Sequence, residues 1–228
     1  MRKLIASTFV SLDGIMQAPG GPDEDPTGGF PFGGWTFAYF DDTMDLSAAG
    51  FDAVGRELVL GRRTYEIFEA YWPYQPAENP IAASINGARK HVASRTLKSL
   101  DWPNSTLLGD DVPAAIAALK ATPGPNLQVI GSGNLLQSLQ AAGLVAQFHV
   151  WTYPVLLGRG KRLFDEHIKP SALRLVRTQT SPAGVVMSTY EPDGDVRPGS
   201  FVQDAPSEKE LARRRKMAGA SRGATGSW

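Results

Sequence analysis

The sequence contains no cysteine among its 228 residues. Disulfide bonds, thiolate catalysis and cysteine-ligated zinc or iron–sulfur sites are therefore excluded. A chain without cysteine is compatible with the reducing cytoplasm, where we expect this protein to act. Its three histidines, His91, His149 and His167, are scattered without the paired spacing of a metal site, so we expect no metal.

The sequence also lacks an excess of charge of either sign, with 23 basic and 23 acidic residues. No overall field would attract nucleic acid or an anionic membrane. No stretch approaches the roughly 20 apolar residues of a membrane-spanning helix. The apolar N-terminal segment is interrupted by Ser7 and Ser11 and followed by Asp13, which predicts a strand and not a signal peptide. We expect a soluble protein.

Composition changes once along the chain. Apolar content of 42% and charged content of 20% are ordinary for a globular protein, and the length suffices for one sizeable core. From about residue 193, glycine, proline, serine and charges replace the periodic pattern. We predict one domain over residues 1–192 and a polar, basic, flexible extension over 193–228, with a short helix over 207–218 and disorder from Gly219 onward. Its run of three arginines and a lysine is more typical of a solvated extension than of a nucleic-acid site.

Short apolar strands alternate with helical segments along the domain. This order predicts an α/β fold in three layers, with helices on both faces of a mostly parallel sheet. Two last strands, 173–180 and 185–190, flank a Ser-Pro-Ala-Gly turn and predict an antiparallel hairpin at one edge. The other expected strands are 3–11, which we place near the sheet centre, and 57–60, 90–94, 106–108, 127–130 and 145–153. The expected helices are 41–54, 63–71, 112–120 and 134–142, the third capped by Asp110-Asp111. Residues 72–89 read as a proline-rich connection.

A long loop, residues 18–35, follows the first strand. It is rich in glycine, proline and acidic residues, and loops of this length in a compact domain are usually functional or disordered. Its aromatic residues Phe30, Phe32 and Trp35 favour a loop that folds back and packs over the domain or a bound ligand.

The triplet Gly131-Ser132-Gly133 directly follows a buried strand and opens a helix. Glycines allow close approach of the backbone to a ligand, and a helix N-terminus offers free N–H groups and a positive dipole end to a phosphate. The triplet lacks the third glycine of the Rossmann fingerprint, and taken alone it is as typical of a tight strand-to-helix turn.

The segment Gly61-Arg62-Arg63-Thr64 repeats this arrangement of strand, glycine and helix. Two guanidinium groups in a first helical turn oppose the helix dipole, and a bound anion would resolve that conflict. Ser94-Arg95 gives a third strand end with a hydroxyl and a guanidinium. Taken alone, each of these segments is also typical of polar residues that follow a strand and face solvent. Together they favour one ligand, because ligands of open α/β folds bind at the carboxyl ends of strands.

Five motifs in this order now resemble a known superfamily: "LIASTFVSLDGIMQ", "LVLGRRTYE", "KHVASRT", "LQVIGSGNLLQSL" and "VWTYPVLLGRGKRLF". They resemble the dihydrofolate reductases, and more closely the branch of the reductase domain of riboflavin biosynthesis. The match covers residues 1–192. The ordered set is fairly specific for fold and cofactor and poorly specific for substrate.

The resemblance implies NADPH as cofactor and a place for each part of it. Gly61, Arg62, Arg63 and Thr64 would hold its phosphates, and Ser94 and Arg95 would lie by the adenosine ribose and its 2′-phosphate. The diphosphate would lie on Gly131, Ser132, Gly133, Asn134 and Leu135. Ala6, Asp13, Gly14 and Ile15 would line the nicotinamide side, and the loop 18–35 would be the mobile lid. In dihydrofolate reductases the glycine pair matching Gly131-Ser132 is joined by a cis peptide.

The catalytic carboxylate of dihydrofolate reductases lies on the helix after the lid. In this sequence Asp41, Asp42 and Asp45 fall in that region, and the spacing to Gly61 favours Asp45. A helix-capping acidic turn is an equally good interpretation of each aspartate. The riboflavin branch does not share this carboxylate reliably.

Three hypotheses about function follow. The first is an NADPH-dependent oxidoreductase that reduces a small heterocycle, either pterin-like or the 5-amino-6-(5-phosphoribosylamino)uracil of riboflavin biosynthesis. The second is a non-catalytic or regulatory NADPH-binding domain. A flavin-using variant ranks last, because the phosphate sites fit a dinucleotide better. Exposed aromatic residues on the late strands and the habits of the resembling family favour a homodimer.

Overall fold

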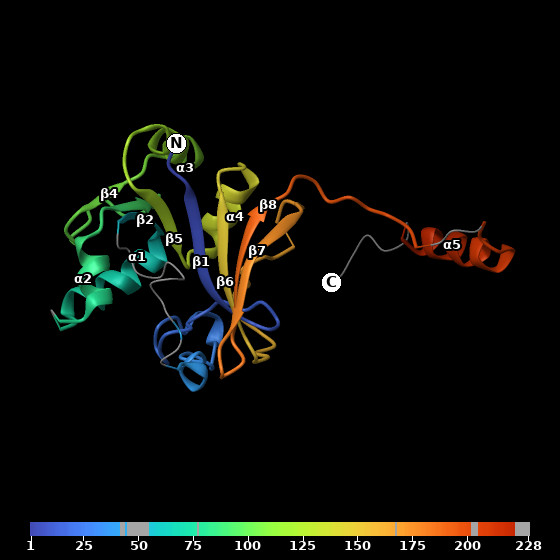
Figure 1. Cartoon of the computed structure of the whole chain (residues 1–228), viewed down its shortest axis with the longest axis horizontal. Helices are drawn as coiled ribbons and strands as arrows, with labels where there is room; N and C mark the ends of the chain where they lie inside the picture. The colour runs from blue at the N-terminus through green and yellow to red at the C-terminus, as the bar shows by residue number, and fades with distance from the viewer. Residues whose placement is uncertain (42–43, 45–54, 77, 167, 202–204, 222–228) are drawn as a thin grey trace. The chain divides into compact units, whose positions relative to one another are not determined.

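The computed structural model describes residues 1–41, 44, 55–76, 78–166, 168–201 and 205–221 (Figure 1). Most of the helix predicted over 41–54, with Asp42 and Asp45, lies outside the described residues, as does His167. The described residues divide into two compact units, Met1–Asp195 and Val196–Trp228.

An eight-stranded sheet forms the middle of the first unit, in the order β4-β3-β2-β5-β1-β6-β8-β7. All neighbours are parallel except β6 with β8 and β8 with β7, which are antiparallel. The α/β prediction, the parallel sheet, the terminal hairpin and the inner position of the first strand are thereby confirmed. The strands are β1 (Leu4–Ser11), β2 (Arg56–Gly61), β3 (Lys90–Ala93), β4 (Ser105–Leu107), β5 (Asn126–Ile130), β6 (Gln147–Tyr153), β7 (Leu173–Thr180) and β8 (Val186–Pro192).

Helices cover both faces of the sheet, because its inner strands alternate their apolar side chains between two cores. Leu58 and Leu60 of β2 enter one core, together with Tyr65 of α1 (Arg62–Glu69) and Ile85 of α2 (Pro80–Gly87). Val59 enters the other core, with residues of α3 (Val112–Ala121) and α4 (Gly133–Ala141). Each fully buried leucine or valine stabilises the fold by about 1.5–3 kcal/mol.

The helix α2 corrects the prediction of an unstructured connection over 72–89. Asn79 caps it, since its side-chain oxygen accepts hydrogen bonds from the N–H groups of Ile81 (3.0 Å) and Ala82 (3.1 Å). Pro80 occupies the first turn, where the missing N–H costs nothing. Asn79-Pro80 is a typical start of a helix, but the other prolines close to it in the sequence made it look like part of a connection. Three 3-10 turns, η1 (Thr27–Gly29), η2 (Phe37–Tyr39) and η3 (Trp72–Tyr74), lie in the lid, directly after it and just before α2.

The second unit contains α5 (Glu208–Ser221), which confirms a helix near the predicted position. It runs three residues further than expected, so the prediction of disorder from Gly219 onward was wrong for 219–221. Glu210 holds this helix turn together through ion pairs with Arg213 (2.6 Å) and Arg214 (2.8 Å).

Candidate active site

The six parallel strands, β1 to β6, all end at the same edge of the sheet. This carboxyl edge carries the residues that the sequence singled out, because the first residues of α1 and α4 and the residues after β1 and β3 all lie there. The site is built from these strand ends.

The two glycine segments meet through one side chain. The Ser132 hydroxyl accepts a hydrogen bond from the N–H of Gly61 (3.0 Å) and donates one to Oγ1 of Thr64 (2.9 Å). A Cβ on Gly61 would lie 3.4 Å from the Ser132 side chain. Close packing and hydrogen bonding thus join the starts of α1 and α4, although 71 residues separate Gly61 from Ser132.

The first backbone N–H groups of α1 and α4 make no hydrogen bond to the side chain of their own N-cap residue. Gly61 and Ser132 are these N-cap residues. Gly131 and Ser132 both have left-handed backbone angles, φ 62° and 55°, and no cis peptide occurs among the described residues. The peptide geometry implied by the family resemblance is therefore not the one found. Two uncapped helix N-termini thus lie side by side at Ser132, an arrangement with the chemistry to accept an anion, and we call this place the Ser132 corner.

The arginines of α1 extend in different directions. Arg62 is exposed and pairs with Glu66 one turn along the same helix (3.0 Å). Arg63 reaches across to the lid, where it donates to the Thr27 hydroxyl (3.2 Å) and lies 3.7 Å from the Asp25 carboxylate.

The remaining predicted cofactor residues follow β3 and begin α4. The Ser94 hydroxyl accepts hydrogen bonds from the N–H groups of Thr96 (3.2 Å) and Leu97 (3.0 Å), so it fixes the turn after β3. Arg95 and Asn134 are exposed, and Leu135 packs against the core below α4.

Asp13 organises the turn after β1. Its carboxylate accepts hydrogen bonds from the Ser11 hydroxyl (2.6 Å) and from the N–H groups of Leu157 (3.2 Å) and Gly158 (2.8 Å). The Ser11 hydrogen bond is the main reason that the pKa of Asp13 lies below its ordinary value of 3.8. Gly14 has φ 82°, a conformation that favours glycine. Asp13 thus ties β1 to the loop after β6.

The other two residues predicted beside the nicotinamide, Ala6 and Ile15, have side chains inside the cores, with exposed fractions of 1% and 0%. Ile15 pairs with Arg162 as an isolated antiparallel bridge. The segment after β1 is therefore locked to the loop after β6 by backbone as well as side-chain contacts.

The lid, residues 18–35, is ordered by a few polar contacts. Gln17 donates to the carbonyls of Asp25 and Thr27, both at 2.9 Å, and its own carbonyl accepts from the Trp35 indole (2.8 Å). Lys161, from the loop after β6, forms an ion pair with Asp25 and donates to the Thr27 hydroxyl (2.8 Å). The loop 18–35 was predicted from the sequence, and its role as a lid stays a prediction. Gln17, Asp25 and Lys161 were not predicted, because their contacts join segments far apart in the chain.

The Asp25 carboxylate of the lid lies close to two basic side chains, Lys161 and Arg63. Its burial alone would raise its pKa, but the hydrogen bonds from Lys161 and Thr27 outweigh burial, and the pKa lies below 3.8. Beside it, a cavity of about 290 Å³ is lined by Gln17, Thr27, Gly28, Phe30, Arg159, Gly160 and Lys161. Gly160 is sterically required there, since a Cβ would lie 2.7 Å from the Ile15 side chain.

Aromatic rings pack where β1 and β6 end. The Tyr153 ring meets Phe9 (5.6 Å between centroids), Trp35 (5.3 Å) and Tyr39 (6.1 Å), each near edge-to-face. Asp41, the one predicted catalytic carboxylate among the described residues, lies two residues after Tyr39 and is half-buried.

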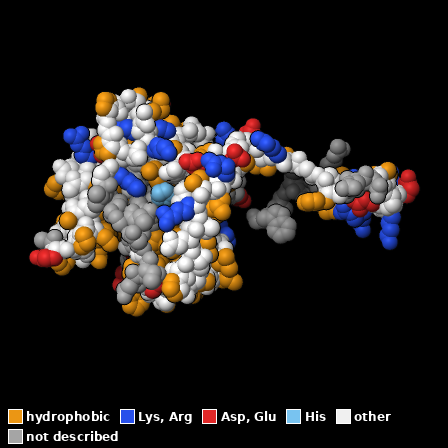
Figure 2. Space-filling view, viewed as in Figure 1, with side chains coloured by type: hydrophobic (Ala, Val, Ile, Leu, Met, Phe, Trp, Pro, Cys, Tyr) orange, Lys and Arg blue, Asp and Glu red, His pale blue; other side chains and the backbone are white. Residues whose placement is uncertain are grey.

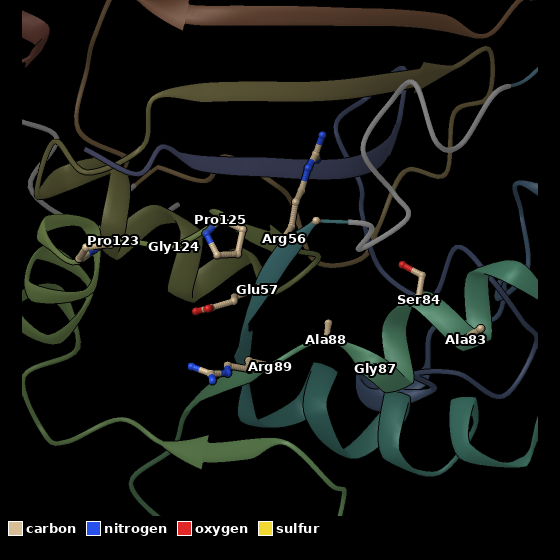
Figure 3. A pocket seen from close by; sticks show the side chains of 11 residues that line it. Arg56, Glu57, Ala83, Ser84, Gly87, Ala88, Arg89, Pro123, Gly124 and Pro125 are labelled. Carbon is tan, nitrogen blue, oxygen red and sulfur yellow. The ribbon is translucent and has the colours of Figure 1, made fainter.

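A second cavity, of about 570 Å³, lies at the opposite, amino edge of the sheet (Figure 3). It is lined by the start of β2, the end of α2 and the loop before β5, and the side chains of Arg56 and Glu57 point apart (Figure 3). The Glu57 carboxylate contacts the Arg2 guanidinium group (2.6 Å) and the His91 ring (2.8 Å). Because its polar groups stabilise the sheet and no strand carboxyl end reaches it, the amino-edge cavity is not our candidate site.

The described residues contain neither a metal-binding cluster nor a membrane-spanning helix. No group of three or more histidine, aspartate or glutamate side chains is placed to hold a metal ion. None of the described helices combines the length and apolar character needed to cross a membrane.

Comparisons with known proteins agree with this architecture. The family model of the RibD C-terminal domain matches residues 2–187. The uncharacterized protein YyaP of Bacillus subtilis (strain 168) is 26% identical over 200 residues, which cover 85% of this chain and 96% of YyaP. A protein assigned to riboflavin biosynthesis from Shewanella sp. PV-4 has a similar structure, with a TM-score of 0.61 and 21% identity over 84% of this chain and 99% of that one. A pyrimidine reductase-like protein from Corynebacterium diphtheriae has a TM-score of 0.54 and 14% identity over 85% and 93% of the two chains.

Proposed function

The chain belongs to the family of the RibD C-terminal domain, and from this membership we propose that it is a cytoplasmic reductase that uses NADPH. Its substrate would be a small heterocycle, either pterin-like or 5-amino-6-(5-phosphoribosylamino)uracil. The observation that carries the proposal is the Ser132 contact, which brings two helix N-termini to one point at the carboxyl edge of the sheet.

The residues at this edge fit a dinucleotide phosphate. Gly61 lies against Ser132, close enough that a Cβ would come within 3.4 Å of its side chain, and the N-cap residues of α1 and α4 make no side-chain cap hydrogen bond. Ser132 and Thr64 would orient a diphosphate, and the exposed Arg95 after β3 is placed for a 2′-phosphate. NADPH would supply the hydride.

The protein's own contribution is to align the reactants and keep water out. The turn at Asp13 and Gly14 positions one wall, because it is tied to the loop after β6. The lid closes the other side through Asp25 and Lys161. Fixed geometry of this kind removes an entropic barrier to hydride transfer.

The direct test is NADPH binding by calorimetry, followed by loss of nicotinamide absorbance with dihydrofolate, the riboflavin pyrimidine, a quinone and an aldehyde. We expect binding and turnover of at least one acceptor. Binding without turnover of any of them would contradict the reductase and leave the regulatory NADPH-binding domain. Absence of NADPH binding would contradict both hypotheses.

Cofactor choice has its own test at Arg95. The 2′-phosphate of NADPH adds charge-assisted hydrogen bonds, so Arg95→Ala should weaken NADPH binding about 10-fold and leave NADH binding unchanged. Lys98→Ala, an exposed cation three residues further on, is the matched control and should leave both affinities unchanged. Equal loss of NADPH affinity in the two variants would contradict the assignment.

We also propose a homodimer that associates through β7. All eight residues of this edge strand are exposed, and Leu173, Leu175 and Val176 have exposed fractions of 39%, 50% and 46%. Figure 2 shows hydrophobic side chains exposed on the flank of the body where β7 and β8 lie in Figure 1. An uncovered apolar edge strand is a ready surface for pairing with a second copy.

A further inference from the structure

The hydroxyl of Tyr153 is buried without a hydrogen-bond partner among the residues that the structure describes. Its side chain is 1% exposed, and no described donor or acceptor reaches the oxygen. Leaving a buried hydroxyl unpaired costs about 1–3 kcal/mol, so such groups are rare in folded proteins unless they have a function. Nearby Tyr65, equally buried, shows the usual arrangement: its hydroxyl donates to Glu69 (2.9 Å) and accepts from the Trp102 N–H (3.2 Å).

Tyr153 lies at the part of the carboxyl edge where an acceptor molecule would sit. It is the last residue of β6 and is in register with Ser11, the last residue of β1. Asp13, two residues further, holds the turn of the proposed nicotinamide wall. Ser132, where the proposed cofactor phosphates would bind, follows β5, and β5 and β6 lie on opposite sides of β1. A substrate that accepts hydride from a cofactor bound at the ends of β5 and β1 would lie at the end of β6, the next strand of the sheet.

The rings around Tyr153 suit a flat molecule. Phe9, Trp35 and Tyr39 surround it near edge-to-face, and none of them gives its hydroxyl a partner. Trp35 belongs to the lid, and its indole N–H is taken by the carbonyl of Gln17. Tyr39 follows the lid, is partly exposed, and donates to the Pro154 carbonyl at a long 3.4 Å. Tyr39 is therefore the partly exposed and weakly held ring among the three that contact Tyr153.

We infer that the Tyr153 hydroxyl binds the substrate, by donating a hydrogen bond to a carbonyl oxygen or ring nitrogen of a flat heterocycle. The inference rests on the proposed reductase function and names a group that contacts the substrate of that reaction. Burial raises the pKa of Tyr153 further above its ordinary value of 10, so the phenol stays a donor at every physiological pH.

This role requires no proton transfer from the tyrosine. NADPH would supply the hydride and water one proton to the double bond of the substrate that is reduced, and the phenol would keep its own proton. Its hydrogen bond would hold the heterocycle in place and withdraw electron density from it. A donor already fixed in a dry, aromatic surround is worth more than the same donor in water.

The test compares Tyr153→Phe with the wild-type protein in three measurements. Thermal stability should be unchanged or higher, because the lost hydroxyl has no partner in the fold. The NADPH dissociation constant should be unchanged. The kcat/KM for the acceptor that the wild type reduces should fall by about 10- to 100-fold, since one hydrogen bond to the reacting molecule is lost.

Tyr65→Phe is the matched control and should show the opposite pattern, with lower stability and unchanged kcat/KM, because its hydroxyl is used within the fold. A Tyr153→Phe protein that melts earlier would show that the hydroxyl has a partner in the fold and would overturn the inference. Unchanged kcat/KM in Tyr153→Phe, with an active wild type, would overturn the inference alone. A wild type that binds NADPH but reduces no acceptor would overturn the proposed function and, with it, this role for Tyr153.

Discussion

At the scale of single residues, Ser132 is the side chain on which the candidate site depends most. Its hydroxyl both accepts from the Gly61 backbone and donates to Thr64. A glycine in its place would make neither contact. Ser132, which stands where dihydrofolate reductases are expected to have the second glycine of a pair, is therefore the residue that connects the starts of α1 and α4.

Ser132→Ala should weaken NADPH binding about 10-fold and lower the free energy of unfolding by about 1–2 kcal/mol, since one buried N–H loses its acceptor. Calorimetry and denaturant unfolding measure the two effects. The control is Ser138→Ala in the same helix, whose exposed hydroxyl donates only to the Asn134 carbonyl (3.0 Å). If both variants bind NADPH like the wild type, Ser132 does not shape the cofactor site.

At the scale of elements, the fold positions the site through contacts between segments that are distant in sequence. The lid is held by Asp25, which lies between Lys161 of the loop after β6 and Arg63 of α1. Any phosphate that engages Arg63 competes with the lid for the same guanidinium group. If the proposed cofactor phosphate is bound by Arg63, cofactor binding and the position of the lid would be linked through this one guanidinium group.

Asp25→Asn should loosen the lid, because an amide cannot form an ion pair with Lys161. We expect faster amide hydrogen exchange over residues 24–30, by about 10-fold, and a higher KM for the acceptor. Asp23→Asn, an exposed neighbour, is the control and should exchange like the wild type. Equal protection in both variants would show that the ion pair does not hold the lid.

The same carboxylate sets the pH range of the lid. A carboxyl whose folded pKa lies below its unfolded value of 3.8 contributes stability that is complete above 3.8 and lost as the pH falls toward the folded pKa. The contribution of Asp25 to lid protection, measured as the difference between the wild type and Asp25→Asn, should therefore be constant from about pH 7 to about pH 5 and should fall only in stronger acid.

The capping of α2 is a second element-scale feature. Asn79→Ala removes the acceptor for two N–H groups of the first turn and should lower the free energy of unfolding by about 1 kcal/mol. Asp111→Ala, which removes the cap of α3 (3.0 Å to the Ala114 N–H), should cost a similar amount. Because the two caps share no partner, the double variant should show the sum. A fully stable Asn79→Ala protein would contradict the capping role.

At the scale of the whole molecule, one edge of the sheet is left uncovered. The hairpin of β7 and β8 extends the sheet past β6, and β7 is exposed along its whole length. Leu175→Arg should convert a dimer into a monomer, as measured by light scattering, because a charge on the paired strand is costly to bury. Tyr74→Arg, a substitution at an 80% exposed aromatic residue elsewhere, should leave the mass unchanged. A monomeric wild type would refute the proposed dimer.

Much of the fold could be predicted because local patterns determine it. The strand from Leu127 to Ile130 is apolar and ends at glycine, and Asp111 caps the next helix upstream as expected. The helix α2 was missed because prolines are ambiguous: Pro80 starts a helix, whereas other prolines nearby interrupt one. The extra turn of α5 was missed because Gly219 has a low helix propensity, a weak preference that neighbouring residues can override.

The sequence by itself determined the α/β class, the parallel sheet with its closing hairpin, and the glycines and arginines of the candidate cofactor site, because each depends on residues close together in the chain. Only the tertiary structure decided that Ser132 joins the two glycine segments, that Arg63 contacts the lid and that Tyr153 packs against Phe9 and Trp35, with no partner for its hydroxyl among the described residues. These contacts join segments many residues apart, and no local pattern encodes which distant partner a side chain will meet.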